Sequence, residues 1–169
     1  MAEALSVAAK EVIEEHFPRI KSLSVQQLEI LKSIFIENKD TFAILPTGHG
    51  KSLPYQIAPL VAQKLSSLGH RHAEFSRFTD RNIVIIISPL LALMEEQAKS
   101  MVAAGITACC LHDESIAKED ILNGRFQLVF GGTEAWVKSD KWRKMLQSQI
   151  YQQRLLLIAA DEAHCIPKW

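Results

Sequence analysis

The chain has 169 residues, a length that suits one domain with a substantial hydrophobic core. Its 19 lysines and arginines balance its 19 aspartates and glutamates, so the strongly basic field typical of many nucleic-acid binders is absent from the whole. A local basic patch is still compatible with this balance. Since no apolar run approaches the roughly 18 residues of a membrane helix, and the acidic N-terminus does not resemble a signal peptide, we expect no membrane partner.

The first half of the chain predicts helices around one short strand. Residues 3–16 have apolar positions at helical spacing, and Ser24 can cap a second helix that follows it. The apolar run TFAIL, residues 41–45, has the length of a strand and leads into a glycine-containing turn. A third helix is expected from Lys51 onward, with Pro54 in its first turn, where the missing N–H costs little.

The second half alternates strands with helices. Its clearest strand is NIVIIIS, residues 82–88, which is β-branched and apolar on both faces, as in a parallel sheet covered by helices. Further strands are expected at 106–111, 126–132 and 154–161, with helices at 90–105, 115–124 and 139–150. This alternation predicts an α/β fold built on a doubly wound, mostly parallel sheet, with the last strand buried.

Other segments carry weaker patterns. Residues 64–82 are polar and basic without periodicity, which predicts a surface insertion. Cys109, Cys110 and Cys165 show no metal-ligand spacing, so we expect reduced thiols and no zinc site. Trp136 and Trp142 are interpreted as packing residues.

The stretch ILPTGHGKSLPYQ, residues 44–56, has the properties of a phosphate-binding loop. Leu45 stands where the literal G-x-x-x-x-G-K-[ST] pattern asks for glycine, yet a strand, a glycine turn and a helix are all predicted in the required order. Lys51 would neutralise the β- and γ-phosphates, and the Ser52 hydroxyl would bind Mg²⁺. The candidate nucleotide-binding residues are Thr47, Gly48, His49, Gly50, Lys51 and Ser52. The simpler alternative is a helix start with a solvated lysine.

A second acidic element follows the last predicted strand. There Asp161 is positioned to hold Mg²⁺ through water, and Glu162 to polarise the attacking water. The alternative is a solvated acidic loop. Together the two elements predict a site for ATP and Mg²⁺ in which Lys51, Asp161 and Glu162 are the catalytic candidates.

Four motifs resemble those of the RecQ family of DEAH-box DNA helicases. PTGHGKSLPYQ is similar to P-T-G-G-G-K-S-L-x-Y-Q, SPLLALMEEQ to S-P-L-x-x-L-M-x-D-Q, and DEAHCIPKW to D-E-A-H-C-I-S-x-W. LSVQQLEIL is similar to the family's glutamine motif. Differences include Leu23 and Ser24 in place of an aromatic residue and arginine, His49 in place of glycine, and FGGTEAW, of which only Glu134 matches. We expect His49 to point outward, away from the phosphates.

The resemblance implies a three-layer RecA-like domain at 23–169, preceded by a helical extension at 1–22. It implies that Gln27 reads the adenine edge and that His164 relays the nucleotide state. The DNA-contacting residues that it implies, for a single strand or a junction, are Ser88, Pro89, Leu90, Gln97 and Trp169.

An intact member of this family would unwind DNA in the 3′–5′ direction in the nucleus. The chain ends at Trp169, before the family's second RecA-like domain, so we expect it to bind nucleotide weakly and to unwind nothing alone. Two alternatives remain: a DEAD/DEAH-box RNA helicase, against which HCIPKW and SLPYQ argue, and a regulatory module that binds nucleotide or DNA without turnover.

Overall fold

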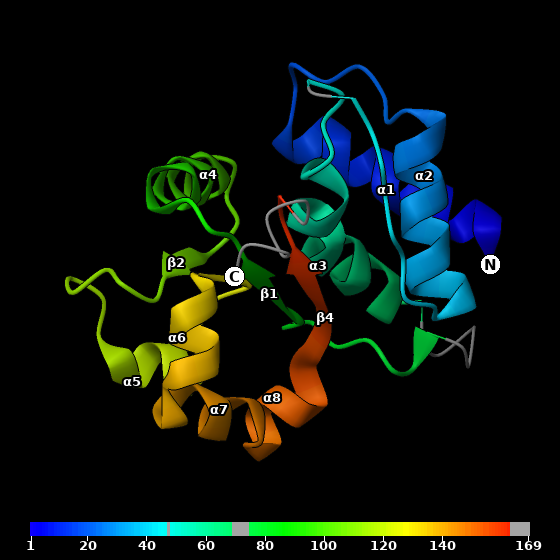
Figure 1. Ribbon diagram of the computed structural model, residues 1–169. Helices are drawn as coiled ribbons and strands as arrows, with labels where there is room; N and C mark the ends of the chain where they lie inside the picture. Colours follow the sequence, from blue (N-terminus) through cyan, green and yellow to red (C-terminus); the bar gives the residue numbers. More distant parts are fainter. Residues whose placement is uncertain (47, 69–74, 163–169) are drawn as a thin grey trace. The chain divides into compact units, whose positions relative to one another are not determined.

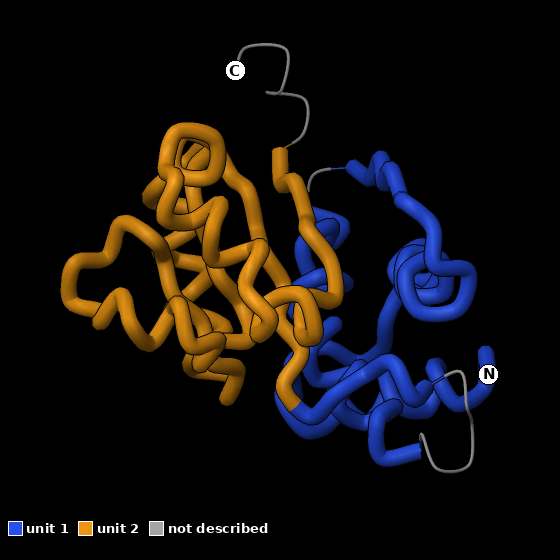
Figure 2. The backbone as a smooth tube through the Cα atoms, turned by 90° about the horizontal axis from the view of Figure 1, so that it is seen from below, with its two compact units in different colours: residues 1–80 blue, residues 81–169 orange. Residues whose placement is uncertain are grey.

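The computed structural model describes residues 1–46, 48–68 and 75–162. The chain divides into two compact units, residues 1–80 and 81–169 (Figure 2). Within the described ranges, no helix has both the length and the apolar character needed to cross a membrane.

Unit 1, residues 1–80, is helical (Figure 1). Its elements are α1 (Ala2–His16), α2 (Val25–Lys32), the π-helical turn η1 (Ser33–Glu37) and α3 (Leu53–Ser66). Helices α1 and α2 both pack against α3. The deeply buried side chains of this unit include Leu5, Val12, Ile13, Leu31, Ile57, Val61 and Leu65.

The predicted cap of α2 is confirmed. The Ser24 hydroxyl accepts a hydrogen bond from the Gln27 backbone N–H at 3.2 Å, and the Gln27 side chain accepts one from the Ser24 N–H at 2.8 Å. This reciprocal capping box satisfies two backbone donors that a helix start leaves unpaired. Pro54 lies in the first turn of α3, as predicted.

The strand predicted at residues 41–45 is wrong. These residues have no regular structure, and the side chains of Phe42 and Ile44 are 80% and 82% exposed. A strand satisfies its N–H and C=O groups only by pairing with another strand. Because none of the described residues of unit 1 forms a strand, the apolar run has no ladder partner there.

Part of the segment predicted as a surface insertion contributes to the core of unit 1. Phe75 and Phe78 are buried, and the Phe78 ring packs edge-on against Phe35 with centroids 5.2 Å apart. The Arg77 guanidinium donates to Asn38 Oδ1 and to the Phe35 carbonyl, both at 2.7 Å. These contacts anchor the segment, while residues 69–74 lie outside the described ranges.

Unit 2 contains a four-stranded sheet in which every pair is parallel, in the order β2-β3-β1-β4. The strands are β1 (Ile83–Ile87), β2 (Ala108–Cys110), β3 (Leu128–Gly131) and β4 (Leu155–Ala160). The helices are α4 (Leu91–Ala103), α5 (Lys118–Leu122), α6 (Thr133–Lys138), α7 (Asp140–Leu146) and α8 (Gln149–Arg154). The predicted α/β class with a parallel sheet is confirmed. The helix expected at 139–150 is two helices, because Ser148 caps a new one through its contact with the Tyr151 N–H.

The core of unit 2 lies between the sheet and the helices that follow β2. Trp136 and Trp142 are both buried in it, which confirms their predicted packing role. The Tyr151 hydroxyl donates to the Ile121 carbonyl at 2.6 Å. Burial raises the pKa of the Cys109 thiol and raises that of Cys110 to about 11, so both thiols stay protonated near neutral pH. Cys165 lies outside the described residues.

Strand β4 is less buried than predicted. It lies at the end of the described sheet and pairs with β1 alone, and its Ile158 side chain is 53% exposed. The apolar sequence therefore predicted the strand correctly, but it did not predict that the strand lies at the edge of the described sheet.

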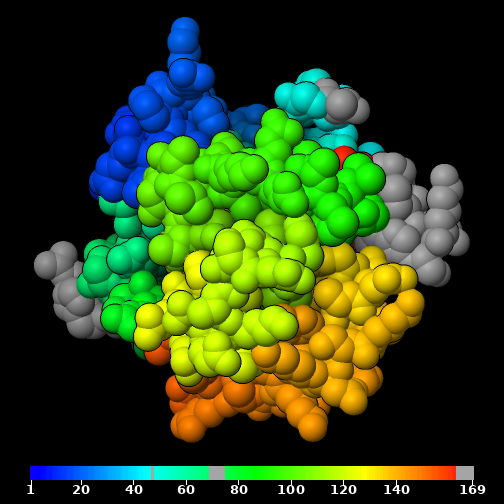
Figure 3. Space-filling model, turned by 90° about the vertical axis from the view of Figure 1, so that its left-hand side faces the viewer, coloured from blue at the N-terminus to red at the C-terminus, as the bar shows by residue number. Residues whose placement is uncertain are grey.

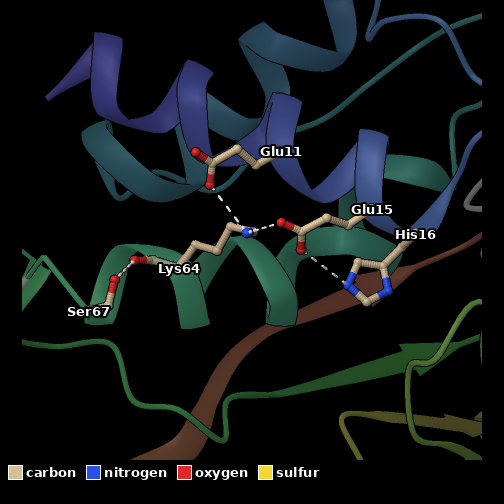
Figure 4. Close-up of polar contacts among 5 residues, drawn as sticks. All are labelled: Glu11, Glu15, His16, Lys64 and Ser67. Atoms are coloured by element: carbon tan, nitrogen blue, oxygen red, sulfur yellow. Dashed lines mark hydrogen bonds and ion pairs between the residues drawn. The ribbon is translucent and has the colours of Figure 1, made fainter.

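An ion-pair cluster joins α1 to α3 (Figure 4). The Lys64 ammonium lies 2.8 Å from a Glu15 carboxylate oxygen and 3.2 Å from one of Glu11, two acids one turn apart on α1. The hydrogen bond from Lys64 lowers the pKa of Glu15, and the bond to Glu15 raises the pKa of Lys64. Both shifts mean that the charged forms stabilise the folded unit.

We predict that Lys64→Met lowers stability mainly between pH 5 and 10. The Glu15 contribution is present above its ordinary pKa of 4.5 and is lost as pH falls through the lowered folded value. The Lys64 contribution is present below 10.5 and is lost as pH rises through the raised folded value. Urea unfolding of wild type and variant at pH 3 and pH 7 checks this prediction, and Lys21→Met, at an exposed position of the same unit, is the control. An equal loss at both pH values would contradict it.

Candidate functional site

The predicted phosphate loop is a tight turn before α3. Gly48 and Gly50 have φ of +82° and +65°, the left-handed region that glycine enters at low cost. The His49 N–H donates to the Pro46 carbonyl at 3.3 Å. His49 itself is exposed and does not have positive φ, and its predicted outward direction stays a prediction. Thr47 lies outside the described residues.

Backbone donors are exposed where the turn enters α3. Among the hydrogen bonds of the described residues, the N–H groups of Gly50, Lys51 and Ser52 have no acceptor. They stand at the start of a 14-residue helix, whose partial positive charge favours an anion. The side chains of Lys51 and Ser52 are half-buried beside them. This arrangement suits a phosphate group.

The Gln27 side chain connects α2 to this loop. Its Nε2 donates to the Gly50 carbonyl at 2.9 Å and to the His49 carbonyl at 3.3 Å, while its Oε1 accepts from Ser24. Gln27 is only 6% exposed. The resemblance implies that Gln27 reads the adenine edge; the sequence did not predict its contact with the loop. The S-x-x-Q spacing of the capping box was the signal that could have fixed the orientation of this side chain.

In unit 2, the predicted metal ligand Asp161 follows β4 directly. Its N–H donates to the Ile87 carbonyl at 2.9 Å, which extends the β1–β4 ladder by one residue. One carboxylate oxygen accepts from the Glu162 N–H at 3.0 Å, and the other accepts from the Gln97 side chain at 3.1 Å. With only 8% of the residue exposed, the carboxylate is held in one orientation. Oriented carboxylate oxygens suit Mg²⁺, which also retains waters and phosphate oxygens as ligands.

Glu162, the predicted water-polarising residue, has an unusual backbone. Its φ is +52°, one of two positive values among the described non-glycine residues. A side chain in this region is strained, and such strain is concentrated at functional positions. The hydrogen bond from its N–H to Asp161 helps to hold this conformation.

The predicted DNA-contacting residues lie where β1 leads into α4. Ser88 is buried at 1% exposure, its N–H donates to the Gly131 carbonyl at 3.2 Å, and its hydroxyl has no partner within the described residues. Pro89 is half-buried and Leu90 is 55% exposed. Figure 3 shows α4, in green, on the surface of unit 2. Gln97, on this helix, is turned toward Asp161.

The structure therefore groups Asp161, Glu162 and Gln97 at the carboxyl ends of β1 and β4. It groups Gln27 with Gly48, His49 and Gly50 in unit 1, next to Lys51 and Ser52. His164 and Trp169 lie outside the described residues, so their predicted roles stay predictions.

Comparison with known proteins gives consistent matches. The family model described as DEAD/DEAH box helicase matches residues 24–169. The chain is 29% identical over 85% of its length to "ATP-dependent helicase SGS1" of Saccharomyces cerevisiae, of which the match covers 9%. It is 26% identical over 96% to "ATP-dependent DNA helicase RecQ" of Synechocystis, covering 31% of it. It is 31% identical over 89% to "ATP-dependent DNA helicase Q-like SIM" of Arabidopsis thaliana, covering 15%. The chain thus spans less than a third of these relatives.

We predict that Gly50→Ala disturbs the loop more than Gly48→Ala. Both positions have positive φ, so each alanine costs about 1–2 kcal/mol of backbone strain. At Gly50 the new Cβ would also lie 2.6 Å from Gln27 Nε2, whereas at Gly48 nothing lies within 4 Å. Thermal unfolding and binding of a fluorescent ATP analogue measure the difference. Equal effects of the two substitutions would show that Gln27 does not hold the loop.

Proposed function

Because the chain belongs to the DEAD/DEAH box helicase family and corresponds to the ATP-binding domain of RecQ-type DNA helicases, we propose that it has two ligands. The first is ATP together with Mg²⁺, and the second is the backbone of DNA. The observation that carries this proposal is the loop before α3. There the side chains of Lys51 and Ser52 lie at a helix N-terminus with three N–H groups that have no acceptor among the described residues. An anion of the size and charge of a triphosphate is the ligand that such a loop favours.

Each polar group then has a defined part. The N–H groups of Gly50, Lys51 and Ser52 bind phosphate oxygens, and the Lys51 ammonium neutralises their charge. The Ser52 hydroxyl and the Asp161 carboxylate are each proposed as ligands of Mg²⁺, and the ion would supply positive charge that neutralises the phosphates. Glu162 orients and polarises a water. Gln97 positions Asp161, because it donates to the oxygen that the Glu162 N–H leaves open.

The DNA contact is proposed for the start of α4. The hydroxyl of Ser88 is buried, so it is the N–H groups of the first turn, beside Pro89 and Leu90, that would meet a phosphate. Such contacts hold a DNA strand in position without recognising its base sequence. Gln97 lies on the same helix, two turns from this start, and therefore links the proposed DNA contact to the proposed metal ligand.

Two alternatives remain as second candidates. The names of several relatives specify DNA helicases, which supports DNA over RNA as the nucleic acid that this chain binds. Stronger binding of single-stranded RNA than of DNA with the same sequence would favour the alternative that the chain belongs to an RNA helicase. Unwinding in the 3′–5′ direction and a nuclear location are proposed for the whole protein; a module that binds without turnover would lack the unwinding.

We predict that Lys51→Ala weakens binding of a fluorescent ATP analogue by about 10- to 100-fold, since a hydrogen bond to a charged group contributes about 1.5–3 kcal/mol. Circular dichroism should be unchanged, because the side chain is not part of the core. Lys99→Ala, at an exposed position of α4, is the matched control. Unchanged affinity of the Lys51 variant would show that the loop is not the site.

We also predict that Gln97→Ala raises the Mg²⁺ concentration needed for tight ATP binding by about 10- to 100-fold, the range found when residues that orient metal ligands are removed. Nucleotide binding without Mg²⁺ should not change. The exposed neighbour Glu96 provides the control variant Glu96→Ala. If Gln97→Ala alters metal-free binding as strongly, Gln97 does not act through Asp161.

A further inference from the structure

The segment from α7 through β4 carries an excess of positive charge. Residues 141–160 contain four basic residues and no aspartate or glutamate, although the whole chain has 19 basic and 19 acidic residues. Three of the four lie exposed on α7, and we call them the α7 patch: Lys141, Arg143 and Lys144. Figure 3 shows the segment from α6 to α8, in yellow and orange, on the surface of unit 2.

The packing of α7 presents this charge to solvent. Trp142 and Met145 are buried in the core of unit 2, so the opposite face of the helix points outward. Lys141 and Lys144 are three positions apart, which makes them neighbours on the surface of a helix. Two ammonium groups can therefore meet one ligand together.

The acids of these helices do not neutralise the two lysines. On α6, Lys138 Nζ lies 2.9 Å from a Glu134 carboxylate oxygen, and on α7 the Arg143 guanidinium contacts the Asp140 carboxylate. These pairs use both acids of residues 133–154. The two lysines of the patch consequently have no carboxylate partner within the described ranges.

Helix stability explains only part of this arrangement. Arg143 and Lys144 stand in the last turn of α7, where a positive charge is favoured by the partial negative charge of the helix C-terminus. Lys141 stands in the first turn, where a positive charge is disfavoured. Its ammonium lies 5.1 Å from the centroid of the Trp142 ring, a contact that offsets part of this cost. A cation kept at an unfavourable helix position indicates a partner outside the helix.

The chemistry of the patch favours a phosphate backbone over a protein surface. Phosphates need only positive charge, whereas the centre of a protein interface is built from apolar and aromatic side chains. Every exposed residue of α7 is charged, and the rings of Trp142 and Tyr151 are only 7% and 0% exposed. Without an exposed ring, the patch offers no platform on which an unpaired base could stack. It therefore suits duplex DNA better than a single strand.

The patch lies at the other end of the sheet from the proposed DNA contact on α4. Helix α4 follows the carboxyl end of β1, whereas α8, which contacts α7, leads directly into the amino end of β4. Because β1 and β4 are parallel, these are opposite ends of the sheet, and Figure 1 shows α7 and α8 below the strands. The two surfaces of unit 2 are therefore separate.

We propose that the α7 patch is a second DNA-contact surface, which binds the phosphate backbone of duplex DNA without recognising its base sequence. It is additional to the contact proposed for α4 and does not depend on it. Each lysine that neutralises a phosphate releases condensed counterions, so the affinity of this surface for DNA falls steeply as the salt concentration rises.

Fluorescence anisotropy with a labelled, blunt-ended DNA duplex at several salt concentrations tests this inference. Lys141→Gln combined with Lys144→Gln should weaken duplex binding about 10-fold or more at about 0.1 M salt, and should reduce the slope of log affinity against log salt by about 2. Lys21→Gln combined with Lys118→Gln removes the same charge at two other exposed positions and should leave the slope unchanged. Equal losses in both variants would show a net-charge effect alone and would overturn the inference.

Two further variants separate charge from packing. Lys141→Arg combined with Lys144→Arg retains both positive charges and should bind the duplex as tightly as wild type, so a loss here would contradict the proposal. Lys144→Gln alone leaves the contact between Lys141 and the Trp142 ring in place. It should reduce the salt slope by about 1, even if the double variant does not fold.

The same measurements distinguish this surface from the sites proposed above. In the double glutamine variant, binding of an ATP analogue and of single-stranded DNA should match wild type. A loss of single-strand binding equal to the loss of duplex binding would overturn the assignment to duplex DNA. Failure of wild type to bind the duplex, or tighter binding of polyglutamate than of the duplex, would overturn the inference while leaving the nucleotide site and the α4 contact in place.

Discussion

The hydrogen bonds of the Gln27 side chain are the constraint on which the loop of unit 1 depends. A phosphate loop is usually positioned by the strand that leads into it, but residues 41–45 form no strand here. The turn is held on one side by α3 and on the other by the bonds from Gln27 to the Gly50 and His49 carbonyls. Because Gln27 also completes the cap of α2, the same amide fixes a helix start and the adjacent loop.

In unit 2 the corresponding constraint is the parallel direction of every strand. Parallel strands bring their carboxyl ends to one edge, which is where ligands lie in open α/β sheets. The ladder continues past the strands themselves: Ser88 donates to the carbonyl of Gly131, and Asp161 to that of Ile87. The main chain therefore positions these residues before any side-chain contact, and Asp161 does not rely on loop geometry for its place.

Local patterns in the sequence predicted the structural features that depend on interactions between residues close together in the chain. The cap at Ser24, the turn glycines and the β-branched strand at residues 83–87 depend on near neighbours, and the structure confirms them. The failures concern long-range pairing. An apolar run becomes a strand only beside another strand, which residues 41–45 lack within their unit, and the edge position of β4 depends on the order of strands. The hydrogen bonds from Gln27 to the loop were not predicted because they join residues more than 20 positions apart.

The hydrogen bond between Gln97 and Asp161 connects the proposed DNA contact on α4 with the proposed Mg²⁺ ligand through one side chain. Gln97 lies on α4, whose first turn is the proposed DNA contact, and donates to a carboxylate proposed to hold Mg²⁺. Any shift of α4 along its axis would move this donor relative to the carboxylate. Asp161 cannot follow freely, since its N–H is tied to β1 and its other oxygen to Glu162, whose φ is already strained. A displacement of α4 would therefore change the hydrogen bonding of the carboxylate before it changed the sheet.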